Sequence, residues 1–476
     1  MKPLILPFKT PLGYYFYETQ RNEIVAVNNE LYNHIKMIMD EQQENIPNTN
    51  QIAEMQFNEL VSFGYMAPPH IKNLEHPATG ILDVLLERKV DRVLLQVTQR
   101  CNLRCQYCVY SEVKNPNTRS HAANAMNFQT AKKAIDFYAK HSIDEEEKAI
   151  GFYGGEPLLE FELIKKIINY ANELFEGKDI IYSITTNGTL LNDDIIEFFV
   201  KNDMNITISL DGPKLIHDKN RKFANGKGSF DIVLQNLVKL KERSTKKIPF
   251  GINMVIDPDN DYEETIKLFE HPVMEGVNIS TALVEEDGIS KAFNSNYYTK
   301  FEYDLFLGIV NYFRGKNLKS SNMLIQQELE QMMDGVNRFK KSLLFDTAAP
   351  SGPCIPGKMR LFIDCFGNLF PCERVSETNP NMKIGTLDTG FDVHQANELL
   401  NISKLTEADC KECWAFSLCS ACGKYAESNN SLCATKRLAY CSKSRNMAFL
   451  KILGKTLEYE NGKHERKICS VKERTV

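Results

Sequence analysis

The chain has 476 residues, 43% of them hydrophobic and 25% charged, and its formal net charge is -5. This length exceeds what one hydrophobic core supports, so about two to four domains are expected. The charge gives no electrostatic case for nucleic acid, and the sequence has neither a secretory signal nor an apolar run of about eighteen residues. We therefore predict a cytoplasmic protein that has neither nucleic acid nor membrane as a partner.

The chain contains 13 cysteines, an unusual number for a cytoplasmic protein. A reducing compartment disfavours disulfides, and an odd number of thiols cannot all pair with one another. Clustered cysteines in such a protein are more typical of metal binding. We therefore expect the cysteines to mark metal sites.

Residues 1–85 contain no cysteine and form the first predicted domain. The pattern predicts two strands and two helices, at Leu4–Phe8, Tyr14–Val27, Glu30–Met39 and Gln51–Phe63. Asn50 fits an N-cap of the second helix, and Gly64 fits its stop. The element order resembles the winged-helix recognition element of enzymes that modify ribosomally made peptides. An α+β accessory domain that only packs on the enzyme is the alternative.

Residues 86–300 alternate between strand and helix patterns, which favours a parallel sheet with right-handed crossovers. The predicted strands are Val93–Thr98, Ala149–Tyr153, Ile180–Thr186, Asn205–Leu210, Phe250–Ile256 and Val277–Leu283. Amphipathic helices such as Leu163–Phe175 lie between them, with apolar residues at the helical period. These units predict an α/β fold built on an open, partial (β/α)6 TIM-like barrel.

Residues 301–345 carry two more helical patterns, Phe301–Phe313 and Met323–Leu344, which we expect to bridge to a third domain. That domain, residues 346–449, is dense in cysteine and has little regular periodicity. We expect metal to take the place of a hydrophobic core there. Residues 450–476 read as a polar, basic tail. Its lysines include Lys463, Lys467 and Lys472.

The first cysteine cluster follows the strand Val93–Thr98 and consists of Cys101, Cys105 and Cys108. Three thiolates so close in sequence can hold one [4Fe–4S] cube, but they bind only three of its irons. The open fourth iron suits a chelating ligand better than simple electron transfer. A structural zinc site is the alternative, yet zinc takes four ligands, and no fourth cysteine or histidine lies close by in the sequence.

The C-x3-C-x2-C spacing, with Tyr107 before the last cysteine, resembles the signature of the radical S-adenosylmethionine (SAM) superfamily. The resemblance covers the whole segment from residue 90 to 300. It implies that the open iron binds SAM and that the reduced cluster cleaves it to a 5′-deoxyadenosyl radical. The three cysteines would then be catalytic, and Tyr107 would lie against the cofactor.

The residues after the second predicted strand also fit this resemblance. Gly154-Gly155-Glu156 resembles the methionine-binding motif of the superfamily. Glycine lets the backbone approach a ligand closely, and Glu156 can accept a hydrogen bond from an ammonium group. An ordinary turn is the alternative.

Polar residues at later strand ends complete the expected SAM site. The resemblance implies that Ser183 or Asn187, together with Ser209, contacts the ribose or the methionine carboxylate. Arg221 resembles the carboxylate-binding arginine of the superfamily, since a guanidinium can bind a carboxylate in bidentate fashion. Ordinary turn residues and a surface arginine are the alternatives.

The cysteine pairs of the third domain would suggest a zinc ribbon if they were taken alone. Their order, C-x12-G-x4-C followed by C-x2-C-x5-C-x2-C and a trailing cysteine, resembles the SPASM extension with its two auxiliary [4Fe–4S] clusters. That family more often has three residues between the last two cysteines of the run. The resemblance assigns Cys354, Cys372 and Cys422 to the first auxiliary cluster. It assigns Cys410, Cys413, Cys419 and Cys441 to the second.

The first auxiliary cluster would have three protein ligands, because Ala-Ala-Pro at 348–350 occupies the region where some relatives place another. We therefore expect an open iron there, which a cysteine thiolate of the substrate could occupy. Cys365 could fill the site instead, and Cys433 could replace Cys441. Cys469, isolated in the tail, reads as a bystander.

Together these resemblances imply a maturase of the sactipeptide and ranthipeptide type, with SAM and three [4Fe–4S] clusters as cofactors. Its substrate would be a ribosomally synthesised, cysteine-containing precursor peptide, and its product a thioether crosslink. An electron donor such as flavodoxin or ferredoxin is expected. The alternatives are an anaerobic sulfatase maturase that forms formylglycine, a maturase that forms carbon–carbon crosslinks, and a zinc-stabilised peptide-binding scaffold without catalysis.

Overall fold

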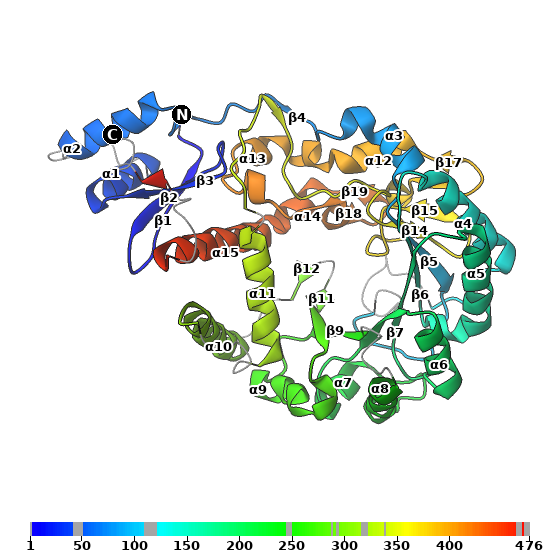
Figure 1. Cartoon of the computed structure of the whole chain (residues 1–476). Coiled ribbons are helices and arrows are strands. Elements are labelled where there is room, and N and C mark those ends of the chain that lie inside the picture. The colour runs from blue at the N-terminus through cyan, green and yellow to red at the C-terminus, as the bar shows by residue number, and fades with distance from the viewer. Residues whose placement is uncertain are drawn as a thin grey trace.

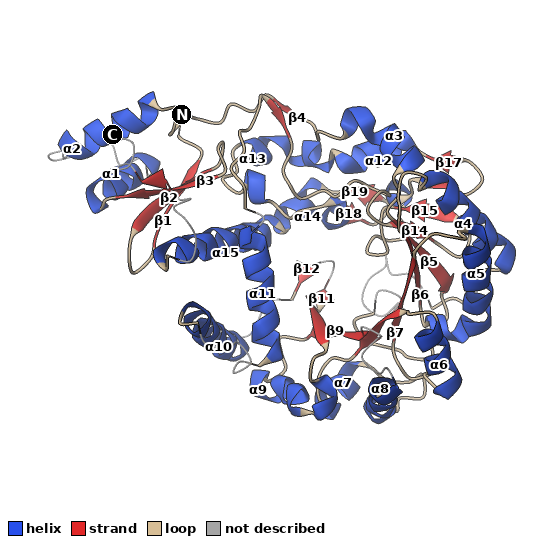
Figure 2. Ribbon diagram, in the orientation of Figure 1, coloured by secondary structure: helices blue, strands red, loops and turns tan. Residues whose placement is uncertain are grey.

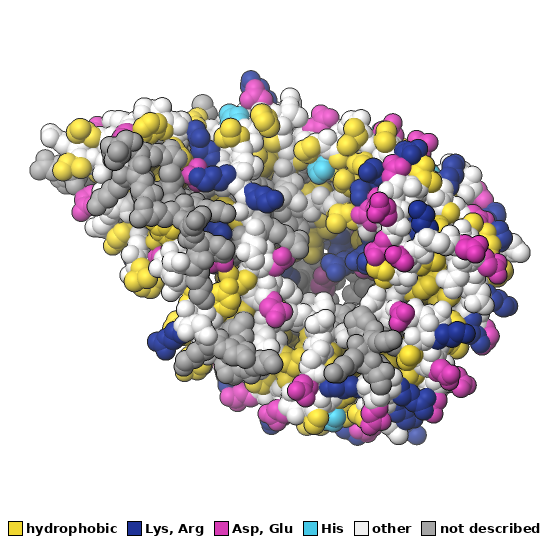
Figure 3. Space-filling view, viewed as in Figure 1, with side chains coloured by type: hydrophobic (Ala, Val, Ile, Leu, Met, Phe, Trp, Pro, Cys, Tyr) yellow, Lys and Arg dark blue, Asp and Glu magenta, His cyan; other side chains and the backbone are white. Residues whose placement is uncertain are grey.

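The computed structural model describes residues 2–40, 51–108, 121–243, 250–286, 289–291, 295–315, 322–337, 339–462 and 469–470 (Figure 1). The predicted N-cap Asn50 lies outside these residues, as do Lys463, Lys467 and Lys472. Among the helices described, none combines the length and the apolar character that crossing a membrane requires. Basic and acidic side chains are interspersed over the surface of the barrel in Figure 3.

An antiparallel sheet and two helices form the N-terminal module, which we define as residues 2–66. Its elements are β1 (Ile5–Lys9), β2 (Tyr14–Glu18), β3 (Glu23–Val27), α1 (Asn29–Met39) and α2 (Gln51–Ser62). Asn28 caps α1, because its side chain accepts a hydrogen bond from the Leu31 N–H. The chain leaves α2 through Gly64, whose φ of +77° confirms the predicted stop.

The prediction of one strand over Tyr14–Val27 is wrong, because the chain reverses between β2 and β3. Asn22 takes the left-handed conformation at φ +46° within this turn. The carboxylate of Glu18 accepts a hydrogen bond from the Arg21 N–H at 2.6 Å, which stabilises the reversal.

Six parallel strands form the barrel sheet, whose strands are red in Figure 2. Each lies within one residue of its predicted bounds. They are β5 (Arg92–Thr98), β6 (Lys148–Gly154), β7 (Ile180–Thr186), β8 (Asn205–Ser209), β9 (Phe250–Ile256) and β10 (Asn278–Leu283). The helices that follow these strands are α4 (Phe128–His141), α5 (Phe161–Leu174), α6 (Asp193–Lys201), α7 (Lys214–Asn220), α8 (Phe230–Arg243) and α9 (Tyr262–Ile266). The main hydrophobic core lies between these helices and the sheet.

The cysteine-rich domain extends the barrel sheet beyond β5. The added strands are β14 (Leu361–Ile363), β15 (Asn368–Phe370), β16 (Gly385–Thr386) and β17 (Gly390–Phe391). β14 pairs in parallel with β5, and its residues belong to the same hydrophobic core as the barrel. The expectation that metal replaces a core throughout this domain is therefore wrong for residues 361–400.

Two helices bridge the barrel to that domain, α10 (Ser295–Phe313) and α11 (Met323–Asn337). α11 ends before the predicted Leu344, because the chain turns to pair with the N-terminal module. The backbone N–H of Leu344 donates to the Gln20 carbonyl at 2.8 Å. A local hydrophobic pattern carries no sign of such a distant partner.

The C-terminal helices surround the remaining cysteines. They are α12 (Val393–Leu400), α13 (Glu407–Lys411), α14 (Ala434–Ala439) and α15 (Cys441–Glu460). α15 runs through the predicted domain boundary at residue 449 and packs against the sheet of the N-terminal module. Tyr15 and Ile24 of that sheet share a buried cluster with Ala448 and Ile452 of α15.

Short elements complete the fold. They are α3 (Leu82–Arg88), β4 (Asn73–Leu74), β13 (Thr347–Ala348), β11 (Glu285–Glu286), β12 (Ile289–Ser290), β18 (Glu427–Ser428), β19 (Ser431–Leu432) and β20 (Cys469–Ser470). β20 pairs in parallel with β3, so Cys469 lies at the edge of the N-terminal sheet. Residues 469–470 thus lie on the same module as the first three strands.

Candidate functional site

Three cysteines follow β5 at the carboxyl edge of the barrel sheet. We call Cys101, Cys105 and Cys108 the loop cysteines. Their loop runs beside the chain that follows α7, where the Arg104 N–H donates to the Lys222 carbonyl at 2.7 Å. Leu103 is buried and forms an antiparallel bridge with Phe223. The loop is thus fixed by backbone pairing on both sides of Cys105.

Gly154 and Gly155 lie where the end of β6 meets the chain that enters the loop. A Cβ atom on Gly154 would lie 2.2 Å from the Thr98 carbonyl oxygen, and one on Gly155 would lie 2.1 Å from that of Arg100. The Gly155 N–H donates to the Thr98 carbonyl at 2.8 Å. These glycines therefore permit a close approach of two backbones, and their predicted contact with SAM stays a prediction.

Glu156 is fully buried and links the ends of β6 and β7. Its Oε1 accepts from the Leu158 N–H at 3.0 Å and from Thr186 Oγ1 at 2.7 Å, and its Oε2 accepts from the Asn187 N–H at 2.7 Å. Burial raises the pKa of Glu156 to about 7, although these hydrogen bonds favour the carboxylate. These contacts give Glu156 a structural role beside the site, and its predicted contact with an ammonium group is not tested by them.

Asn187 reaches the cysteine loop from the end of β7. Its Nδ2 donates to Asn102 Oδ1 at 2.8 Å and lies 3.9 Å from the Cys101 sulfur. Ser209 is buried at the end of β8, whereas Ser183 lies deeper in β7, beside Gly151. The structure therefore brings Asn187 into contact with the loop and leaves the two serines along the sheet.

Arg221 and Tyr107 meet a buried carboxylate that the sequence prediction did not include, Asp211. Arg221 Nε donates to Asp211 at 2.9 Å, and the Tyr107 hydroxyl donates to the same oxygen. The other oxygen accepts from the Val255 N–H at 3.0 Å. Burial alone would lower the pKa of Arg221, but the charge of Asp211 raises it. The position of Asp211 directly after a predicted strand was the available signal.

The chemistry of the loop cysteines fits an iron–sulfur cluster. Burial raises the pKa of Cys101 to about 12 and that of Cys105 to about 11, although the charge of Arg221 opposes the rise at Cys105. Such thiols stay protonated at neutral pH unless a metal replaces the proton. No three His, Cys, Asp or Glu side chains in the described ranges converge on a single metal ion. The ligands of a [4Fe–4S] cube bind separate irons and need no such convergence.

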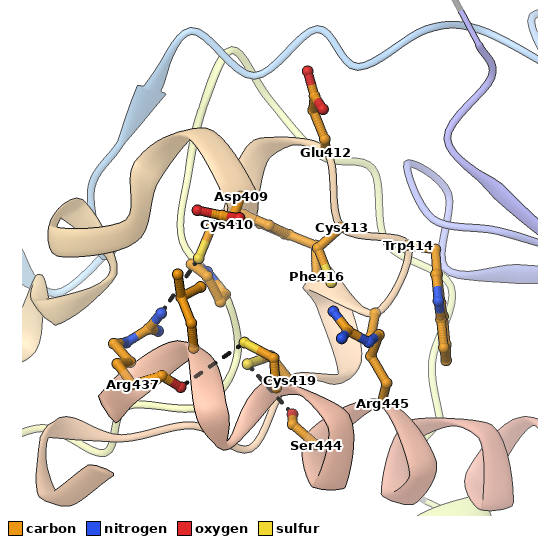
Figure 4. A pocket seen from close by; sticks show the side chains of 14 residues that line it. Asp409, Cys410, Glu412, Cys413, Trp414, Phe416, Cys419, Arg437, Ser444 and Arg445 are labelled. Atoms are coloured by element: carbon orange, nitrogen blue, oxygen red, sulfur yellow. Dashed lines mark hydrogen bonds between the residues drawn. The ribbon is translucent and has the colours of Figure 1, made fainter. Parts of the chain in front are cut away.

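Four cysteines of the third domain line one cavity of about 440 Å³ (Figure 4). We call it the four-cysteine cavity, and its cysteines are Cys410, Cys413, Cys419 and Cys441. Trp414, Phe416, Arg437 and Arg445 are among its other lining residues. The structure thus brings together the four predicted ligands of the second auxiliary cluster.

The predicted ligands of the first auxiliary cluster, Cys354, Cys372 and Cys422, lie within electrostatic reach of one another. Burial, followed by the charge of Glu373 and of the other two cysteines, raises the pKa of Cys372 to about 11. The charge of Cys422 likewise raises the pKa of Cys354, after burial. Ala348, in the region of the missing ligand, is buried in β13 and offers only a methyl group.

The two alternative cysteines lie elsewhere. Cys365 is buried in the barrel core, where its N–H donates to Gln96 Oε1 at 3.2 Å. Cys433 precedes α14 at its N-cap position, and backbone N–H groups there lower its pKa. Among the two candidates for the trailing ligand, Cys441 lines the four-cysteine cavity and Cys433 does not.

Residues 95–271 match the family model of the Radical SAM superfamily. The part of the chain that carries the loop cysteines and Glu156 is therefore a radical SAM domain, and the chain is an enzyme. A match to this superfamily implies SAM and one [4Fe–4S] cluster as cofactors.

Two relatives place this domain in context. The chain is 26% identical over 403 residues to a cysteine-type anaerobic sulfatase-maturating enzyme of Clostridium novyi, a match that covers 78% of this chain and 99% of the relative. It is 42% identical over 168 residues to an uncharacterized protein of Methanocaldococcus jannaschii, covering 35% of this chain and 54% of that protein.

A solved structure shares the fold. It is described as native anSMEcpe with bound AdoMet and Kp18Cys peptide, and the likeness has a TM-score of 0.57 at 20% sequence identity. It covers 78% of this chain and 99% of that chain. The likeness therefore spans nearly all of the relative and leaves part of this chain unmatched.

Proposed function

We propose that this enzyme is a maturase that forms a thioether crosslink in a ribosomally synthesised, cysteine-containing precursor peptide. The observation that carries the proposal is the place of the N-terminal module beside the four-cysteine cavity. Thr19 Oγ1 of the module donates to the carbonyl of Trp414, a residue that lines the cavity, at 2.7 Å. Tyr17 is buried in the same contact. A peptide held by the module would lie close to the auxiliary cysteines.

The lengths of the matches support an additional recognition function. The match covers 99% of the sulfatase-maturating relative but only 78% of this chain. About a fifth of this chain thus goes beyond a maturase of that type. We propose that the winged-helix-like N-terminal module belongs to this additional part of the chain and that its ligand is the precursor peptide.

In this proposal the loop cysteines hold a [4Fe–4S] cluster that, with SAM bound, supplies a 5′-deoxyadenosyl radical. Glu156 and Asn187 hold the ends of β6 and β7 against the cysteine loop. Asp211 neutralises Arg221 and fixes Tyr107 on the other side of that loop. These contacts orient the site before any substrate enters.

A substrate carbon loses a hydrogen atom to the deoxyadenosyl radical, which becomes 5′-deoxyadenosine. A cysteine thiol of the same peptide loses its proton, and its sulfur bonds to the carbon radical. One electron then leaves the product for a one-electron acceptor. An external donor such as flavodoxin or ferredoxin supplies the electron that cleaves the next SAM molecule.

The first auxiliary set gives the substrate thiol a place to bind. Cys354, Cys372 and Cys422 would leave one iron without a protein ligand, because Ala348 cannot ligate. We propose that the substrate cysteine takes this position as a thiolate. If a peptide with serine in place of that cysteine perturbs the cluster spectrum as strongly as the native peptide does, the idea is wrong.

A sulfatase maturase that forms formylglycine is the second candidate. The match to the Clostridium novyi enzyme over nearly its whole length favours it. The solved relative with a bound peptide, described as Kp18Cys, shows that its fold accommodates a peptide of that kind. Either function acts on a polypeptide, so the chemistry of the product must separate them.

Mass spectrometry of the product separates the candidates. The anaerobically purified enzyme is incubated with SAM, a reductant and a synthetic cysteine-containing candidate peptide. A thioether product loses two hydrogens, keeps its sulfur and has one thiol fewer to alkylate. A formylglycine product loses the sulfur, and a carbon–carbon crosslink leaves every thiol free to alkylate. Loss of sulfur or retention of all thiols would refute the thioether assignment.

Recognition by the N-terminal module needs point variants. Deleting residues 1–85 would expose the buried cluster that Tyr15 and Ile24 share with α15, so loss of function would be uninformative. On α2, Ile52 is 64% exposed and Met55 71% exposed. We expect Ile52→Asp with Met55→Asp to weaken binding of the fluorescently labelled peptide at least tenfold. Asn58→Asp on the same helix is the matched control. Equal affinities for both variants would exclude this surface.

A further inference from the structure

Arg437 projects from α14 into the four-cysteine cavity and is 1% exposed (Figure 4). Its Nη1 lies 3.4 Å from the Cys410 sulfur and also donates to Thr406 Oγ1. The Thr406 hydroxyl in turn lies 3.4 Å from the same sulfur. A buried guanidinium therefore touches one of the predicted cluster ligands directly.

The guanidinium has hydrogen-bonding capacity that the described part of the chain does not use. Its Nε and Nη2 atoms are buried and have no hydrogen-bond partner there. Within the same described ranges, no carboxylate forms an ion pair with Arg437. Asp409 and Glu412, which also line the cavity, are exposed. A buried cation without a counter-charge is strongly disfavoured, so the cavity calls for an anionic occupant that accepts hydrogen bonds.

A [4Fe–4S] cluster with four thiolate ligands is such an occupant. Its oxidised core carries two positive charges against four negative thiolates, so the whole is an anion that gains another negative charge on reduction. Its sulfur atoms accept hydrogen bonds, and such bonds and nearby charges set the reduction potential of iron–sulfur clusters. Arg437 offers a permanent charge and N–H donors in a place closed to water.

We propose that Arg437 is a positioning residue that raises the reduction potential of the second auxiliary cluster by donating from its buried guanidinium to cluster sulfur. The proposal rests on ligation of that cluster by Cys410, Cys413, Cys419 and Cys441, as assigned above. Arg445 lines the same cavity but is exposed, so water screens its charge more. Arg437 is therefore the stronger determinant of the potential.

The test uses the full chain with all three loop cysteines replaced by alanine, so that signals come from auxiliary clusters alone. Iron, labile sulfide and zinc are counted, and the clusters are titrated with reductant under EPR detection. In this parent, Arg437→Met should keep the iron content and lower the reduction equilibrium constant of one auxiliary cluster at least tenfold. For a one-electron couple this corresponds to about 59 mV. Arg437→Lys, which keeps the charge with fewer directed donors, should shift the potential less.

The controls separate this role from folding and from the cluster assignment. Arg445→Met should shift the potential less than Arg437→Met. An unchanged potential in an iron-replete Arg437→Met variant would overturn the proposal. If Arg437→Met loses the iron while Arg437→Lys keeps it, the charge holds the cluster, which supports the proposal. If both variants lose their iron and also lose the native circular dichroism spectrum, the role of Arg437 is structural only. If Cys441→Ala has the same iron and sulfide content as the parent, the cluster assignment fails instead.

Discussion

Asp211 joins three segments around the cysteine loop through one buried carboxylate. It accepts hydrogen bonds from Tyr107, from Arg221 Nε at 2.9 Å and from the Val255 N–H at 3.0 Å. The side chains of Asp211 and Arg221 are 2% and 9% exposed. Replacing Asp211 by alanine would leave the guanidinium buried without its counter-charge. We therefore expect this substitution to loosen the loop.

The free-energy cost of the Asp211→Ala substitution follows from the burial of this ion pair. Removing one partner of a buried ion pair costs about 3–5 kcal/mol, because the remaining charge stays in a medium of low dielectric constant. The Lys214–Asp231 pair, with side chains 56% and 70% exposed, offers the contrast. Exposed pairs contribute about 0–1 kcal/mol. Asp231→Ala is thus a matched control that removes an aspartate from an exposed pair of the same domain.

Hydrogen exchange of the full chain, followed by mass spectrometry, measures the loosening locally. A cost of about 3–5 kcal/mol in local opening makes exchange faster by roughly two to four powers of ten. Asp211→Ala should show this at residues 103–108 and at Val255, and it should lose SAM cleavage. Asp231→Ala should leave both properties near wild type. Wild-type exchange at Val255 in the Asp211→Ala variant would refute this reasoning.

Three further variants test the radical SAM domain. The pKa of Glu156 is raised to about 7 from 4.5, so the folded state binds more protons in this window and stability falls as pH rises through it. Glu156→Gln should flatten that slope in urea unfolding measured at several pH values. Gly155→Ala would place a Cβ 2.1 Å from a backbone oxygen and should abolish iron binding by the loop, whereas Gly80→Ala meets nothing within 4 Å and should not. Alanine at all three loop cysteines should abolish 5′-deoxyadenosine formation while auxiliary iron stays bound, as iron analysis and chromatography would show.

The barrel strands were predictable because each is a short apolar run followed by a helix with its own period. The turn between β2 and β3 was missed for the opposite reason. Its sequence, Thr19-Gln20-Arg21-Asn22, contains neither glycine nor proline, and the reversal depends on Asn22 in the left-handed conformation. The early end of α11 depends on pairing with residues that lie more than 300 positions away in the sequence. No local pattern encodes such a contact.

The sequence predicted which cysteines lie together better than it predicted which charged residues lie around them. Ligand spacing constrains which thiols can meet, and the structure gathers Cys410 and Cys441 around one cavity as expected. Spacing says nothing of counter-charges, because neither Asp211 nor Arg437 belongs to a cysteine motif. The position of Asp211 directly after a predicted strand was a signal, but only the fold shows that Asp211 pairs with Arg221 and that Arg437 contacts Cys410.

The two buried arginines show why these counter-charges matter. Arg221 beside the loop cysteines is paired with Asp211, so the chain itself balances the charge at that site. Arg437 touches Cys410 and has no such carboxylate among the described residues. The first site can therefore form its hydrogen-bond network from protein groups alone, whereas the guanidinium in the four-cysteine cavity is balanced only once an anion binds there. This difference makes the second cavity the part of the site whose charge balance depends most on its occupant.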